Sequence, residues 1–214
     1  MEFLKRLAAP IIDLLAKISW NPIRALVNNG LFFSLKEDDW DKLEELLSKN
    51  YYIILTRSSS HLSTYLVSIG TRINDGHWGH WGHALMNLEG DDPTKDDFKL
   101  MEATGKGVHF STFWEVFTCD SVALLKPKSL SAEEWTAVME TLLKQEGKEY
   151  DTLCDLANDQ KLNCVELCRL ALSAAPNYKT SFANFEAMIV KNKNLTPESF
   201  YHCPDFEVVW EVRR

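Results

Sequence analysis

The sequence predicts an α+β fold. Segments with helical periodicity come first along the chain, and short β-rich runs are then mixed with further helical segments, an order that is typical of this class. The 214 residues are 45% hydrophobic and 25% charged, which is the composition of a globular chain able to bury a sizeable core. We expect a helical arm over residues 1–50 and a single domain over residues 51–214.

Residues 1–20 are predicted to form an amphipathic helix, because apolar side chains recur there at helical spacing. Lys5, Arg6 and Lys17 interrupt the apolar sequence, so we expect neither a membrane span nor a secretory signal. Two interpretations stay open for residues 1–34. They pack on this domain or on a second copy of the chain, or they make peripheral contact with a membrane, where the three cations would face anionic headgroups.

A second helix is predicted over residues 36–49, whose apolar side chains share one face and whose first turn, residues 37–39, is acidic. Residues 51–56 (YYIILT) follow as a short, buried strand. A helix over residues 61–69 comes after a serine-rich N-cap. Residues 71–82 are rich in Gly, His and Trp, and we expect a loop there.

The middle of the chain predicts a β-hairpin and one further strand. Residues 83–88 and 98–103 are β-rich, and the polar residues 89–97 between them are typical of a turn. If the first two strands pair antiparallel, their outer ends lie side by side. Residues 121–126 form another strand candidate.

The C-terminal half contributes a helix over residues 131–146 and a last strand over residues 206–212. The helix opens with Ser131 and Glu134, whose spacing is that of a capping box. The strand sequence FEVVWEV alternates and is predicted to end the sheet.

Cys164 is the first residue of another helix, predicted over residues 164–175, which follows Asn163 and stops before Pro176. A thiol at a helix N-terminus has a lowered pKa because the positive end of the helix dipole favours the thiolate. The free N–H groups of the first turn can also face a developing oxyanion. On spacing alone, Cys164 is either an activated nucleophile or a small buried hydrophobic residue.

A reactive thiol needs a base and an acceptor that orients the base. His83 lies at the start of one predicted hairpin strand, and Glu102 lies on the other, next to a glycine-rich turn. Antiparallel pairing of the hairpin would bring the two side chains together at its open end. A Cys–His–Glu triad follows from this arrangement.

The ordered set IILTR, WGHALM, LMEATGKGV and YDTLCDL…NCVEL, followed by a Thr-Pro step, resembles a known family. This family is the permuted papain-like amidases, the YiiX/YaeF-type branch of the NlpC-like cysteine peptidases, which are more distantly related to lecithin-retinol acyltransferases. The resemblance covers about residues 51–210. It implies a circularly permuted papain-like fold, in which an antiparallel sheet packs against the nucleophile-bearing helix.

The same resemblance implies roles for individual residues. Cys164 would be the nucleophile, His83 the base and Glu102 the polar third member of the triad. The chain differs from the usual family motif on either side of the cysteine, with Asn163 in place of Tyr and Val165 in place of Ser.

The function implied is a cysteine hydrolase that cleaves an amide bond, with peptidoglycan stem peptides or γ-glutamyl linkages as candidate substrates. A lipid acyltransferase or thioesterase using the same triad is an alternative, and so is a non-catalytic assembly module. Substrate contacts are assigned to Trp81, to Tyr150, and to Arg57. Arg57 has two alternative partners, a structural carboxylate or the histidine-rich loop.

Other patterns suggest metal sites, but no metal or cofactor is expected. His77, His80 and His83 recur at every third position, a spacing that does not bring three imidazoles to one face of a strand. Cys164 and Cys168 share a helix face, with Cys154 as the nearest further ligand. We expect His109 to be a solvated loop residue, Cys119, Cys154 and Cys168 to be core residues, and Cys203 to be a loop thiol without a role.

The charge and the cysteine count exclude some functions. A formal net charge of −8 argues against sequence-independent nucleic-acid binding. Five cysteines are an odd number without the spacing of a secreted disulfide framework. We therefore expect a reducing, cytoplasmic location, with peripheral membrane or virion association left open.

Overall fold

The computed structural model describes residues 35–58, 67, 79–88, 98–152, 160–192 and 195–213. The predictions for residues 1–34, including their membrane or subunit contacts, lie outside the described residues. The same holds for the turn predicted over residues 89–97 and, apart from Val67, for the helix predicted over residues 61–69.

A six-stranded antiparallel sheet forms the centre of the molecule, with the strand order β4-β3-β2-β1-β5-β6. The strands are β1 (Ile53–Arg57), β2 (His83–Asn87), β3 (Leu100–Thr104), β4 (Gly107–Ser111), β5 (Ser121–Pro127) and β6 (Phe206–Val212). The α+β class is therefore as predicted, and β6 ends the sheet. The finer prediction of a permuted papain-like arrangement stays a prediction.

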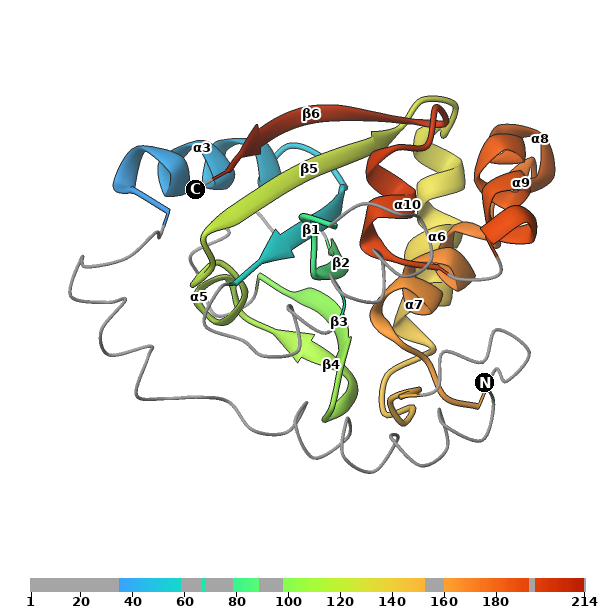
Figure 1. The fold of residues 1–214 in the computed structure, drawn as a ribbon, viewed down its shortest axis with the longest axis horizontal. Helices are drawn as coiled ribbons and strands as arrows, with labels where there is room; N and C mark the ends of the chain where they lie inside the picture. Colours follow the sequence, from blue (N-terminus) through green and yellow to red (C-terminus); the bar gives the residue numbers. More distant parts are fainter. Residues whose placement is uncertain are drawn as a thin grey trace.

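Helices cover both faces of this sheet (Figure 1). The helices of the described residues are α3 (Glu37–Leu47), α5 (Phe113–Val116), α6 (Ala132–Leu143), α7 (Cys164–Leu172), α8 (Tyr178–Ser181), α9 (Ala183–Asn192) and α10 (Pro197–Tyr201). Figure 1 shows α6 to α10 together on one side, and α3 and α5 on the other.

The two sides have separate hydrophobic cores, because successive side chains of a strand point to opposite faces. Ile53 and Leu55 of β1 belong to the core under α6 and α7, whereas Ile54 belongs to the core under α3 and α5. Leu43 and Leu47 attach α3 to this second core. The boundary predicted at residue 50 stays a prediction, although α3 packs directly on the sheet.

Local signals in the sequence account for most of these elements. The predicted Ser131–Glu134 capping box is present at the start of α6, and the last strand has the predicted bounds. The hairpin of β2 and β3 is antiparallel, with Met86 opposite Met101. None of the helices in the described ranges has both the length and the apolar character needed to cross a membrane.

Strand β4 was not predicted, and the expectation that His109 lies in a solvated loop is wrong. His109 lies on β4, directly opposite Glu102 of β3, and its side chain is only 27% exposed. The tight turn before β4 ends at Gly107, whose φ of 94° is a conformation that favours glycine. The apolar–polar–apolar alternation of Val108, His109 and Phe110 is the sequence pattern that indicates a strand here.

Candidate active site

The first turn of α7 holds Cys164 in a fixed position. The side-chain oxygen of Asn163 accepts hydrogen bonds from the backbone N–H groups of Val165 (2.9 Å) and Glu166 (3.0 Å). The Glu166 carboxylate in turn accepts the backbone N–H of Asn163 at 2.9 Å. This reciprocal cap defines the start of the helix, so the Cys164 thiol lies at the positive end of the helix dipole.

His83, the first residue of β2, links two other side chains of the site. Its Nε2 atom lies 2.7 Å from Oε2 of Glu102, and Cys164 is near enough to the imidazole to raise its pKa. Because Nε2 donates to the carboxylate, Nδ1 is the ring nitrogen that remains for the thiol. The structure therefore brings Cys164, His83 and Glu102 together from α7, β2 and β3.

The surroundings of His83 favour its protonated form. Burial disfavours the charged imidazolium, but the hydrogen bonds and charges of Cys164 and Glu102 outweigh it and raise the pKa of His83 well above its ordinary value. An imidazolium between a carboxylate and a sulfur atom is the arrangement that stabilises a thiolate.

Glu102 is held as a carboxylate although its side chain is only 13% exposed. Burial acts to raise the pKa of Glu102, but hydrogen bonding and charge from His83, with further contributions from Ser111 and His109, lower it overall. The carboxylate therefore keeps its negative charge beside His83, where it can orient the imidazole.

Two residues next to Glu102 were not expected in the site. The Ser111 hydroxyl donates a hydrogen bond to Oε1 of Glu102, and Nε2 of His109 lies 3.5 Å from the same oxygen. Both residues come from β4, whose register with β3 cannot be derived from the His83 and Glu102 motifs. The alternation of apolar and polar residues around His109 is the sequence signal from which the position of these two residues beside Glu102 could have been predicted.

A buried glutamate anchors the segment that leads into β2. Oε1 of Glu198, on α10, accepts the backbone N–H groups of His80 and Trp81, the latter at 2.8 Å. Oε2 of the same carboxylate lies 3.1 Å from Nε2 of His202. Glu198 follows the Thr-Pro step of the sequence, a helix-start signal, but nothing local indicates a partner 118 residues away.

Arg57 contacts the histidine-rich loop, which is one of its predicted alternatives. Its Nη1 atom donates to Nδ1 of His80 at 2.9 Å. Burial, together with the positive charges of Arg57 and Arg213, lowers the pKa of His80 to about 4, so the imidazole is neutral and can accept this bond. A substrate contact by Arg57 stays a prediction.

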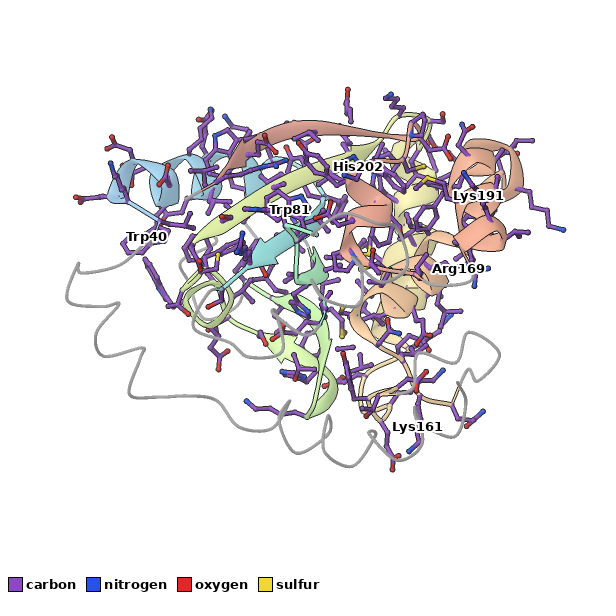
Figure 2. All side chains as sticks on the ribbon, in the orientation of Figure 1. Trp40, Trp81, Lys161, Arg169, Lys191 and His202 are labelled. Carbon is purple, nitrogen blue, oxygen red and sulfur yellow. The ribbon has the colours of Figure 1, made fainter. Side chains whose placement is uncertain are left out.

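The predicted substrate contact of Trp81 does not fit its position. Its side chain is 0% exposed, and Figure 2 shows it in the interior of the molecule. The ring packs against Tyr201 of α10, with a centroid distance of 5.7 Å, and under the guanidinium of Arg213. Trp81 is a core residue here. Tyr150 is partly buried against the same core, and its substrate role stays a prediction.

The structure contains little that supports the metal alternatives. His77 and Cys154 lie outside the described residues, and within those that are described no group of three or more His, Cys, Asp or Glu side chains could hold a metal ion. Cys119 and Cys168 are buried, as predicted. Cys203, predicted to be a loop thiol, lies between α10 and β6, but its side chain is buried in the core. Burial raises the pKa of its thiol to about 12.

Comparison with known proteins gives one structural neighbour. No protein-family model and no curated protein matches the chain. Among solved structures, the chain is similar to a crystal structure of the metalloprotein yiiX from Escherichia coli O157:H7 (DUF1105), with a TM-score of 0.55 and 14% sequence identity. The match covers 76% of this chain and 97% of that chain. At this identity, the similarity concerns the fold alone.

Proposed function

We propose that this protein is a cysteine hydrolase that cleaves an amide bond. Cys164 is the nucleophile, His83 is the general base and acid, and Glu102 orients the imidazole. One observation carries the proposal: His83 interacts with the thiol of Cys164 on one side and with the carboxylate of Glu102 on the other. Three separate elements supply these residues, so the fold and not local sequence creates the arrangement.

The reaction follows from the positions of these groups. The Cys164 thiolate attacks the amide carbonyl carbon, and a carbon–sulfur bond forms while an electron pair moves onto the carbonyl oxygen. The backbone N–H of Cys164, in the first turn of α7, faces this oxyanion. The His83 imidazolium then donates its proton to the nitrogen, the carbon–nitrogen bond breaks and the amine leaves.

Water completes the cycle. His83 takes a proton from a water molecule, whose oxygen attacks the thioester carbon. The carbon–sulfur bond breaks, the carboxylic acid leaves and the thiolate is restored beside a protonated His83. The net reaction converts an amide and water into an acid and an amine.

The similarity to yiiX supports a YiiX-like fold, and the motif resemblance suggests amide substrates such as peptidoglycan stem peptides. The neighbouring structure, yiiX, is that of a metalloprotein. Among the described residues of this chain, no group of three or more His, Cys, Asp or Glu side chains could hold a metal ion. The proposed reaction therefore uses the thiol as its nucleophile.

The first experiment measures the reactivity of each thiol. Iodoacetamide at a pH of about 6, well below the ordinary thiol pKa of about 8.5, should label Cys164 selectively, and peptide mapping identifies the labelled residue. His83→Ala should slow this labelling at least about 100-fold, because the imidazolium that stabilises the thiolate is gone. Cys168, on the same helix, is the internal control. Equally slow labelling of all thiols would contradict the proposal.

The second experiment identifies the acyl group. The purified full chain is incubated with peptidoglycan fragments, with acyl thioesters or with phospholipid micelles, and intact mass reports an acyl adduct on Cys164. An adduct and a released amine with the peptide substrates, both absent in Cys164→Ala, are the expected results. An adduct with phospholipid alone would assign the triad to lipid acyl transfer instead.

A further inference from the structure

The two oxygens of the Glu102 carboxylate have different partners. Oε2 accepts from His83 at 2.7 Å. Oε1 accepts the hydroxyl hydrogen of Ser111 and lies 3.5 Å from Nε2 of His109. Each oxygen therefore has its own partners, and only Oε2 faces the proposed catalytic imidazole.

The register of β3 and β4 creates the Oε1 side. Glu102 is directly opposite His109, and Ser111 is opposite Leu100. Ser111 is two positions from His109 along β4, so the two side chains point to the same face as Glu102. A direct and a diagonal cross-strand neighbour thus meet on one oxygen atom.

His109 is itself held in orientation. Its Nδ1 atom donates to the backbone carbonyl of Gly107, 2.9 Å away, which directs Nε2 toward Glu102. Gly107 has a positive φ and lies at the end of the tight turn between the strands. The turn therefore fixes the imidazole that faces Oε1.

A carboxylate bonded on one oxygen alone can rotate, because the terminal torsion of a glutamate side chain has a broad energy profile. Rotation would move Oε2 away from His83. The hydrogen bond from Ser111 to Oε1 restricts this rotation, and hydrogen bonds to a charged group are among the stronger ones in proteins. The imidazole of His109, 3.5 Å from Oε1, lies on the same side.

We propose that Ser111 and His109 are positioning residues, which hold Glu102 so that Oε2 stays on His83. The inference rests on the proposed role of His83 as the base for Cys164. Neither residue needs to touch the substrate. Their effect passes through Glu102 to the orientation of the imidazole, and from there to the thiolate.

The decisive measurement is the NMR signal of the His83 Nε2 proton in the ¹⁵N-labelled full chain. In the native protein, the hydrogen bond to Glu102 should protect this proton from exchange with water. Ser111→Ala should broaden or abolish the signal at neutral pH, whereas Ser111→Thr keeps the hydroxyl and should retain it. Ser173→Ala, which removes an exposed hydroxyl at the end of α7, is the matched control and should leave the signal unchanged.

Thiol reactivity provides a second readout. Ser111→Ala should lower the rate of Cys164 alkylation about tenfold, as expected for the loss of one hydrogen bond to a charged group, and Ser111→Thr should restore most of it. His109→Val introduces a residue that favours strands, and it is the second variant if Ser111→Ala does not fold. Like Ser111→Ala, it should weaken the protection of the His83 Nε2 proton.

The outcomes separate this inference from the proposed function. An unchanged His83 signal and an unchanged alkylation rate in folded Ser111→Ala and His109→Val would overturn the positioning role. Slow alkylation of the native protein would contradict the proposed nucleophile, whereas the NMR comparison would still decide whether Ser111 and His109 hold Glu102 in place.

Discussion

At the scale of residues, the central feature is a histidine whose charge is set by its neighbours. His83 lies between Cys164 and Glu102, and both interactions favour the imidazolium over the neutral ring. Glu102 keeps its charge for the complementary reason, because His83, Ser111 and His109 all stabilise the carboxylate. The chemistry proposed for the thiol depends on this mutual stabilisation more than on any property of cysteine itself.

The raised pKa of His83 predicts how stability depends on pH. A group whose pKa is higher in the folded than in the unfolded state stabilises the fold below its unfolded pKa, here the ordinary value of 6.5, and this contribution is lost as the pH rises through the folded pKa. Urea unfolding of the native protein and of His83→Gln should therefore differ most near a pH of about 6, by about 1–3 kcal/mol. The difference should shrink at alkaline pH. A difference that grows with pH would contradict the proposed charge state.

At the scale of elements, the cap of α7 links helix stability to the reactivity of Cys164. Asn163→Ala removes the acceptor for two backbone N–H groups and should lower the free energy of unfolding by about 1–2 kcal/mol. The first turn also loosens, so alkylation of Cys164 should slow.

Ser131→Ala is the matched control, because it removes the same kind of cap from α6. Unfolding experiments should show a similar loss of stability in this variant, with the alkylation rate unchanged. An equal loss of Cys164 reactivity in both variants would mean that global stability, not the cap itself, controls the thiol.

The turn before β4 gives an independent test of backbone strain. Gly107 has a φ of 94°, and a Cβ atom there would lie 2.5 Å from the carbonyl oxygen of Lys148. Gly107→Ala should destabilise the protein by about 2–4 kcal/mol, from the left-handed conformation and from this clash.

Gly147 separates the two causes. Its φ is 83°, but a Cβ atom would meet nothing within 4 Å, so Gly147→Ala should cost only about 1–2 kcal/mol. Thermal or urea unfolding of both variants measures the difference. Equal losses would mean that the contact with Lys148 relaxes without consequence.

Sequence reasoning found the elements that have strong local signals, and it missed the pairings that have none. The apolar run of β1 and the capped start of α7 are readable because hydrophobic pattern and capping chemistry lie within a few residues. The short helices α5, α8 and α10 have only four or five residues each, too few for a helical period to show. His83 and Glu102 were inferred from one hairpin.

The partners that support this pair were not predictable in the same way. Ser111 and His109 depend on the register of a second hairpin, and Glu198 reaches a segment that is 118 residues away in the chain. Such contacts follow from tertiary packing, which no periodicity of a single sequence encodes.

At the scale of the whole molecule, the sheet couples two cores that lie on its opposite faces. Leu43 of α3 is fully buried against the face opposite α7. Leu43→Ala should lower the free energy of unfolding by about 2–5 kcal/mol, through the lost burial and the cavity that remains. The loss should appear in one cooperative transition, since β1 and β2 contribute to both cores.

Leu143→Ala is the control for this prediction, because that side chain is exposed on α6 and its removal should change stability by no more than about 0.5 kcal/mol. Circular dichroism and tryptophan fluorescence should report the same midpoint for Leu43→Ala. Two separate transitions would instead support an arm over residues 1–50 that unfolds independently of the sheet.

The anchor at Glu198 has a consequence for the stage of synthesis at which the proposed site is assembled. A nascent chain that has emerged as far as α7 already contains Cys164, His83 and Glu102, but the backbone of His80 and Trp81 still lacks the carboxylate that holds it. The strand β6, which completes the sheet, emerges later still. We therefore expect the thiol to acquire its aligned imidazole only after α10 and β6 have left the ribosome. A ribosome-bound fragment that ends at α7 should remain inert toward alkylation at a pH of about 6.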